Sequence, residues 1–253
     1  MKKSIVCLVA LLTVASIPVF CQSNTTLHVN AGVSMPVAAF AVSTYEAGTP
    51  PSQAKTGFYT DAQLLCNKGG GHFKPAALLG FEINFFNLKK ILDDLNQNQS
   101  NFNWEGSHGN WVTVSLMPGL YYSTNSSGKT VFYAGIYTGP AAVKIPNYTV
   151  TGKPRQAGVT GSAEGKRESK WSVTAGSRLN AGIRLKAGKR TMLELQAGIN
   201  YCKPTYKEVN TTFTQRYLQP GSTAEQIAIS RLQYSFTQTV ITMHAGAGLV
   251  FKL

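Results

Sequence analysis

Glu105, Ser107 and His108 are the residues of this sequence whose types and spacing come closest to a catalytic set. A serine, a histidine and a carboxylate suffice for acyl transfer when the histidine accepts the serine proton and the carboxylate orients the imidazole ring. Ser107 and His108 are adjacent, however, and glycines flank the pair, so nothing local fixes their geometry. We interpret the stretch as an exposed turn and predict no enzyme, with acyl transfer as the less favoured alternative.

Metal and cofactor sites are not indicated by the remaining reactive residues. The 4 His and 4 Cys are scattered, without C-x-x-C or H-x-x-x-H spacing. The glycine run 69–71 lacks the lysine and the serine or threonine of a phosphate-binding loop. We therefore predict no cofactor and no metal. Cys66 and Cys202 are expected near opposite ends of the fold, so no disulfide should join them.

The N-terminus has the parts of a secretory signal. Lys2 and Lys3 precede an apolar run from Ile5 to Val19, and a plausible cleavage site follows Cys21. We expect residues 1–21 to be a signal peptide and residues 22–253 to form one domain, exported by the general secretory route. The formal net charge is +13. Without a nucleic-acid-binding motif, this charge favours anionic lipid or glycan over nucleic acid as a partner.

Alternation of apolar and polar residues dominates the chain after the signal. In 170–186, for example, Val173, Leu179 and Ile183 lie on one face while Arg178 and Asn180 lie on the other. Glycines fall on the polar face of each clear segment. The segments that we predict as strands are 26–36, 56–66, 73–87, 110–122, 130–144, 170–186, 190–203 and 236–253.

The connections between these strands alternate strictly between long and short. The long ones are 37–55, 88–109, 145–169 and 204–235, and the short ones are 67–72, 123–129 and 186–190. Short turns at one end and long loops at the other are typical of an all-β, eight-stranded, antiparallel, up-and-down transmembrane β-barrel. Strands of this length cross a bilayer when tilted. The other candidate is a soluble secreted β-sandwich with its polar faces in water. We expect interfacial girdles from Trp111, Tyr122, Trp171, Tyr201, Tyr234 and Phe236.

Three stretches resemble one family of membrane barrels. They are Phe20-Cys21-Gln22, the first strand from Val29 to Pro36, and the ending from Ala245 to Leu253. They are similar to eight-stranded outer-membrane β-barrels typified by OmpA, OmpX and OmpW, particularly the porin-family barrels of Bacteroidetes. The resemblance implies a bacterial outer-membrane location in a Gram-negative cell. It also implies that Phe251 and Leu253 form the signal for the barrel-assembly machinery, although the family usually ends in phenylalanine.

The barrel interpretation assigns a role to the charged residues of the inward faces. A barrel of eight strands is just wide enough for side chains to fill it, and buried charges must be paired. We expect a polar network in the lumen, with a narrow passage for ions or small solutes, as in a small porin, as the alternative. The members of the network are Asp61, Glu82, Glu194, Arg178, Arg184, His28, His244 and Lys252.

The long loops are the predicted functional surface. Leu88, Ile91, Leu92 and Leu95 have helical spacing, with Asn87 as the N-cap. Such a helix would lie on the membrane, cap the barrel mouth or pack on its rim. A basic outer loop would contact lipopolysaccharide phosphates or an acidic surface partner, or remain solvated. We predict a non-enzymatic barrel that anchors four long loops; a lipid-modifying enzyme is a weaker alternative. The basic residues are Lys144, Lys153, Arg155, Lys166, Arg167 and Lys170.

Overall fold

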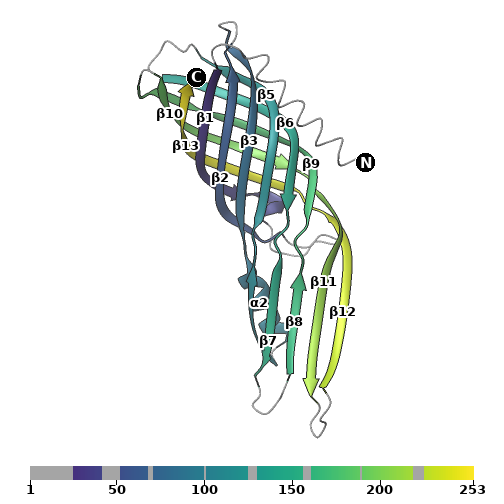
Figure 1. The fold of residues 1–253 in the computed structure, drawn as a ribbon. Coiled ribbons are helices and arrows are strands. Elements are labelled where there is room, and N and C mark those ends of the chain that lie inside the picture. The colour runs from purple at the N-terminus through teal and green to yellow at the C-terminus, as the bar shows by residue number, and fades with distance from the viewer. Residues whose placement is uncertain are drawn as a thin grey trace.

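The structure is a computed structural model that describes residues 25–41, 52–67, 71–99, 101–124, 130–155, 161–188, 190–218 and 225–253. The predicted signal peptide, 1–21, lies outside these residues. The described part holds one closed barrel and one open sheet. Figure 1 shows the barrel with the open sheet projecting from one of its ends.

Eight antiparallel strands close the barrel in the order β1-β13-β10-β9-β6-β5-β3-β2. All eight strands predicted from the alternation are present, and β1 pairs with β13 to close the wall. The fold class is therefore confirmed as an all-β, eight-stranded closed barrel. The strand bounds are β1 Thr25–Pro36, β2 Ala54–Cys66, β3 Phe73–Phe86, β5 Trp111–Ser123, β6 Thr130–Lys144, β9 Trp171–Lys186, β10 Thr191–Cys202 and β13 Val240–Lys252.

Apolar side chains point out of the barrel and polar side chains point in. Along β9, Val173 and Leu179 are exposed while Arg178 and Asn180 are buried. Along β10, Leu195 is exposed while Glu194 is fully buried. The alternation thus separates an apolar outer wall from a polar core, the reverse of the arrangement in a soluble sheet.

Glycines on the inward face make room for large side chains. A Cβ at Gly246 would lie 2.6 Å from the hydroxyl oxygen of Tyr59, and one at Gly182 would lie 2.7 Å from that of Tyr133. Both distances are shorter than real contacts allow. A Cβ at either position would come still closer, at 2.1–2.2 Å, to a backbone carbonyl oxygen of a paired strand, so these inward positions require glycine.

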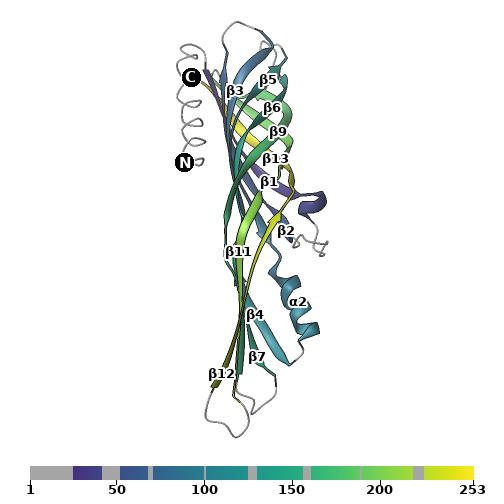
Figure 2. The same cartoon turned by 90° about the vertical axis from the view of Figure 1, so that its right-hand side faces the viewer.

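The second sheet extends one side of the barrel wall. Its strand order is β12-β11-β8-β7-β4. In the same order, these strands adjoin in sequence the barrel strands β13, β10, β9, β6 and β5. We call this element the projecting sheet; Figures 1 and 2 show it continuing the long axis of the molecule. Its strands are β4 Phe102–His108, β7 Tyr148–Pro154, β8 Gly161–Arg167, β11 Thr205–Leu218 and β12 Glu225–Thr237.

The treatment of the long connections as loops is therefore wrong for three of them. Residues 88–109 hold α2 (Leu88–Asn98) and β4, 145–169 hold β7 and β8, and 204–235 hold β11 and most of β12. Pairing with neighbours gives these polar stretches their strand structure. Extended segments in register satisfy one another's backbone groups even where side-chain alternation is weak.

Helix α2 packs on one face of the projecting sheet (Figure 2). Leu88 is buried, and Ile91, Leu92 and Leu95 pack against the core cluster that includes Trp104. A Cβ at Gly106 of β4 would lie 3.2 Å from Leu88 Cδ2, so helix and strand are in close contact. The helical spacing is confirmed, and the helix packs on β4 of the projecting sheet instead of the barrel rim or mouth; its position relative to the membrane stays a prediction. Asn87 precedes the helix but makes no capping hydrogen bond through its side chain.

The segment between β1 and β2 contributes a short plug where the barrel meets the projecting sheet. The 3-10 helix η1 (Ala38–Phe40) buries Phe40, whose ring meets Trp111 edge-on at 5.2 Å. The Trp111 indole donates a hydrogen bond of 2.9 Å to the Ser52 carbonyl. Trp111 is therefore a buried core residue and does not belong to a surface girdle. Phe236 is also buried. Tyr122, Trp171 and Tyr201 are exposed on the outer wall.

Candidate functional site

The barrel core contains a first polar cluster centred on Glu194 of β10. Glu194 is fully buried and lies 2.8 Å from His28 Nδ1 of β1. The Tyr133 hydroxyl donates a hydrogen bond of 2.7 Å to the same carboxylate. Arg184 Nε lies 3.4 Å from Glu194 Oε2, an ion pair between adjacent strands. Three elements far apart in sequence thus converge on one carboxylate.

A second polar cluster is centred on Asp61 of β2. Arg178 Nη2 lies 2.5 Å from Asp61 Oδ2 and 3.1 Å from His244 Nε2. The side chains of Asn30 and Gln196 each donate a hydrogen bond of 3.1 Å to Asp61. Because the carboxylate accepts several hydrogen bonds and faces a guanidinium, its charge is compensated inside the wall.

Glu82 and Lys252 depart from the expectation that every inward charge is paired. Glu82 is buried and accepts hydrogen bonds from the Ser34 hydroxyl and the Asn200 amide, without an ion pair among the described residues. Hydrogen bonds from neutral groups compensate this carboxylate. Lys252 has the inward phase of β13 but is exposed at the end of the barrel away from the projecting sheet. The network therefore excludes Lys252.

Large side chains fill the rest of the lumen beside the two polar clusters. Tyr121, Tyr137, Leu78 and Met117 all have inward phase and are fully buried. The Tyr137 hydroxyl donates a hydrogen bond of 2.9 Å to Gln63, so these large side chains contact the polar network directly. This packing suits a structural core better than a conduit for solutes, because an eight-stranded wall encloses little more than its own side chains.

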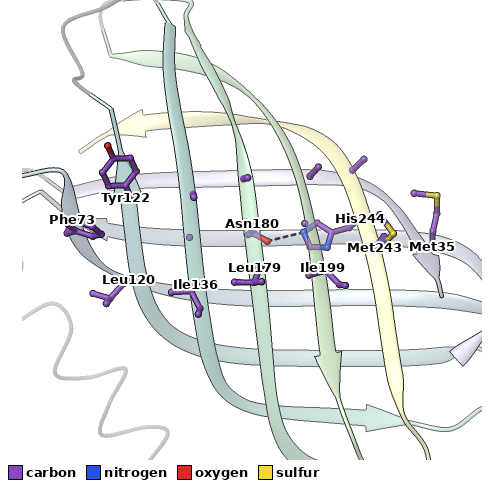
Figure 3. A pocket seen from close by; sticks show the side chains of 16 residues that line it. Met35, Phe73, Leu120, Tyr122, Ile136, Leu179, Asn180, Ile199, Met243 and His244 are labelled. Carbon is purple, nitrogen blue, oxygen red and sulfur yellow. Dashed lines mark hydrogen bonds between the residues drawn. The ribbon is translucent and has the colours of Figure 1, made fainter. Parts of the chain in front are cut away.

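The outer wall carries a shallow apolar groove of about 690 Å³. Leu120, Ile136, Leu179 and Ile199 lie side by side across four strands in Figure 3, on the opposite side of the wall from the Asn180–His244 hydrogen bond. A row of small residues, Ala134, Ala181, Ala197 and Ala245, forms the floor because these positions are paired in register. Exposed apolar residues of this density mark a surface that faces a medium other than water.

The structure does not assemble Glu105, Ser107 and His108 into a catalytic site. The stretch is strand β4, not a turn, and adjacent residues of a strand point to opposite faces. Glu105 pairs with Lys153 at 2.6 Å, and His108 Nδ1 lies 2.8 Å from the Gly109 carbonyl oxygen. Among the described residues, none of the His, Cys, Asp and Glu side chains form a group of three suited to a metal ion. The helices described are too short or too polar to cross a bilayer.

The predicted basic outer loop is a pair of strands, and its cations have different environments. Lys153 and Lys166 are exposed on the sheet face opposite α2. Arg155 donates hydrogen bonds to Asn103 and Asn96. Arg167 is buried: its guanidinium donates to the Pro146 carbonyl and stacks 4.7 Å from the Tyr148 ring. Arg167 is therefore a packing residue and is not available to phosphates.

Lys144, Lys170, Phe251 and the two cysteines lie near the barrel ends. Lys144 is paired in register with Trp171 at the end that meets the projecting sheet, and Lys170 donates to the Glu208 carbonyl nearby. Phe251 lies on the outer face of β13, and Leu253 follows it at the opposite end. Cys202 is a free, buried thiol, so it forms no disulfide with Cys66.

Fold and site together define a closed eight-stranded barrel with an apolar outer wall, a polar core and a projecting sheet. This is the architecture of the eight-stranded outer-membrane barrels that the sequence resembles.

Comparison with solved structures finds similar chains among outer-membrane proteins. Neisserial surface protein A matches with a TM-score of 0.44 at 8% identity, covering 90% of this chain and 97% of its own. A major outer membrane protein of Thermus thermophilus matches with a TM-score of 0.40 at 10% identity, covering 90% and 99%. Ail of Yersinia pestis matches with a TM-score of 0.37 at 12% identity, covering 90% and 99%. No family model and no curated protein matches the sequence.

Proposed function

We propose that this chain is a non-enzymatic outer-membrane β-barrel that anchors the projecting sheet outside the bilayer, where the sheet binds a protein partner. The observation that carries the proposal is the contrast between the two parts. The barrel presents Phe132, Leu179 and Leu195 outward from a closed wall, whereas the projecting sheet is open and continues beyond one end of the barrel. A closed barrel leaves no unpaired strand edge in lipid, which is the condition for a sheet to span a membrane.

The orientation follows from the lengths of the connections. Outer-membrane barrels have short periplasmic turns and long external segments, so the projecting sheet lies outside the cell and the short turns lie in the periplasm. Lys144 beside Trp171 suits the external headgroup level, where a cation contacts lipopolysaccharide phosphates and an aromatic ring lies in the interface. The barrel-assembly machinery would act on the C-terminal strand with Phe251 and Leu253.

Strand β12 is the proposed contact with the partner. It is the last strand of the projecting sheet, so one of its edges has no neighbour among the described strands. Ile227, Ile229 and Leu232 on this strand are all more than half exposed. A long apolar edge strand is a template for pairing with an extended segment of another protein, whose backbone would satisfy the unpaired groups.

Selection of phage-displayed peptides on the full chain in nanodiscs tests this function. We expect strand-forming peptides to be selected and to lose binding to the Ile227→Lys, Ile229→Lys double variant. The matched control, Thr212→Lys, Thr214→Lys, adds the same charges to the same face of the interior strand β11 and should retain binding. Equal loss in both variants, or no strand-forming peptides, would reject the β12 contact. Stepwise conductance of the protein in planar bilayers would instead favour the small-porin alternative.

A further inference from the structure

The barrel holds a polar cavity of about 270 Å³ at the end away from the projecting sheet. Its lining comes from the ends of the barrel strands and from the turns that join them. Four basic residues line the cavity, Lys74, Arg184, Lys252 and His72, and against them stands the α-carboxylate of Leu253 but no Asp or Glu side chain. Asn67 and several Thr and Ser residues add neutral hydrogen-bonding groups. The cavity is therefore rich in donors and cations.

Arg184 forms the inner wall of this cavity and packs against two tyrosine rings. The rings of Tyr121 and Tyr133 stack on each other with centroids 5.2 Å apart, and the guanidinium lies 4.9 Å from each centroid, against the pair. The side chain is more than nine-tenths buried, yet Nε and Nη2 donate no hydrogen bond to any described group. Its one ion pair, with Glu194, has Nε 3.4 Å from the carboxylate oxygen. A buried guanidinium with unused donors is costly unless another acceptor reaches it.

The carboxylate of Glu194 does not offset the whole positive charge of this end. It is already shared with His28 and Tyr133 as well as Arg184. Lys74, on the inward face of β3, lies close enough to Arg184 and Lys252 for both cations to act on it electrostatically. Like charges collected around one cavity repel each other, so an anion bound among them would relieve an existing cost.

We propose that this cavity binds a phosphate-bearing anion, with the Arg184 guanidinium at its inner end and Lys74 and Lys252 at its mouth. A tetrahedral oxyanion matches the donor geometry of a guanidinium and accepts from several ammonium and hydroxyl groups at once. The source of the phosphate is either a soluble ion or the headgroup of a phospholipid in the adjacent leaflet. Both present the same chemistry to these residues.

Calorimetry with inorganic phosphate tests the soluble source. The full chain in octyl glucoside, which carries no phosphate, should bind one equivalent. We expect Lys74→Gln, Lys252→Gln to weaken binding by about a hundredfold, since each of the two lost charged hydrogen bonds is worth about a factor of ten. Lys186→Gln, Arg190→Gln is the matched control: both residues are exposed at the same end but do not line the cavity. Its affinity should be unchanged.

Native mass spectrometry tests the lipid source. The full chain is released from galactolipid nanodiscs doped with phosphatidylglycerol, and retained phospholipid is counted. Selective retention by the wild type and the control, lost in the Lys74→Gln, Lys252→Gln variant, assigns the site to a headgroup. Phosphate binding without retained lipid assigns it to a soluble anion.

A third variant, Arg184→Gln, should lose binding in whichever of the two experiments detects it for the wild type. Different migration of its cold and heated forms on SDS gels shows that this variant still folds. Absence of binding in both arms, or equal weakening by the lysine pair and its control, would overturn the proposal. The β12 contact is unaffected by either result.

Discussion

The barrel and the projecting sheet are built from adjoining strands of the same wall, but the side chains that they expose and bury are of opposite polarity. In the barrel, Leu195 is exposed and Glu194 is fully buried. In the projecting sheet, the charged residues Glu105 and Lys153 are exposed and Trp104 is buried under α2. Alternation of apolar and polar residues therefore defines the two faces of a strand but not which face meets solvent. Closure of the wall and the identity of the buried side chains decide that.

The largest difference between the two regions should appear on removal of a buried carboxylate. Glu194→Ala leaves Arg184 as an uncompensated buried cation and deprives His28 and Tyr133 of their acceptor. We expect the free energy of unfolding in phosphatidylcholine vesicles to fall by about 3–5 kcal/mol. Urea titrations followed by tryptophan fluorescence measure it. Glu194→Gln, which retains an acceptor, should lose less, and a loss below about 1 kcal/mol for the alanine variant would contradict the buried-pair account.

A charge placed on each apolar surface should distinguish lipid from water. Leu195 in the middle of β10 and Ile229 on β12 are both about half exposed. Leu195→Arg should lower stability in vesicles by about 2–4 kcal/mol because its guanidinium enters hydrocarbon. Ile229→Arg should change stability by no more than about 0.5 kcal/mol, as expected of a solvated surface position. Equal effects of the two substitutions in the same urea titration would contradict the assignment of the barrel wall to lipid and of the projecting sheet to water.

A cavity under helix α2 should loosen the projecting sheet without opening the barrel. Leu88→Ala deletes a buried side chain that contacts Gly106 and costs the sheet about 2 kcal/mol, the low end for such truncations. Limited proteolysis should cut the projecting sheet faster. The cold form should keep its distinct migration on SDS gels, since the barrel wall is intact. Loss of that migration would show that the two regions unfold together.

The smallest effect is expected at the exposed ion pair of the projecting sheet. Glu105 and Lys153 lie 2.6 Å apart with side chains 64% and 68% exposed. Glu105→Ala should change the protease resistance of the sheet by the equivalent of about 0.5 kcal/mol or less, because solvent screens such pairs. A loss comparable to that of Leu88→Ala would mean that the polar face is buried against something.

The barrel was predictable from sequence because lipid and a filled lumen impose a strict pattern. In β9, Leu179 must face out and Arg178 must face in, and Gly182 must leave room for Tyr133. Each requirement is visible as alternation with glycine on the polar face. The predicted ranges agree with the observed ones to within two residues for seven barrel strands, and the eighth, predicted from 236, begins at Val240.

The projecting sheet was missed because its strands obey no such single rule. In β8, Ala163 and Gly165 alternate with Glu164 and Lys166, so the buried side lacks the large apolar residues that indicate a strand. Its structure comes from pairing with β7, which precedes it in the chain, and with β11, which follows only at Thr205–Leu218. Arg167 was likewise assigned to a basic outer loop, although its stacking on Tyr148 depends on contacts that only the folded sheet provides.

Spin-label accessibility in reconstituted vesicles tests whether the barrel wall faces lipid while the projecting sheet faces water. Labels are attached to Leu195→Cys on the barrel wall and to Ile229→Cys on the projecting sheet, with the parent chain as the background for its own cysteines. We predict that relaxation of the label at 195 responds to molecular oxygen and not to a water-soluble nickel complex, and that the label at 229 responds to the nickel complex. Nickel access at both positions would contradict the membrane barrel and favour a protein that meets water on all sides.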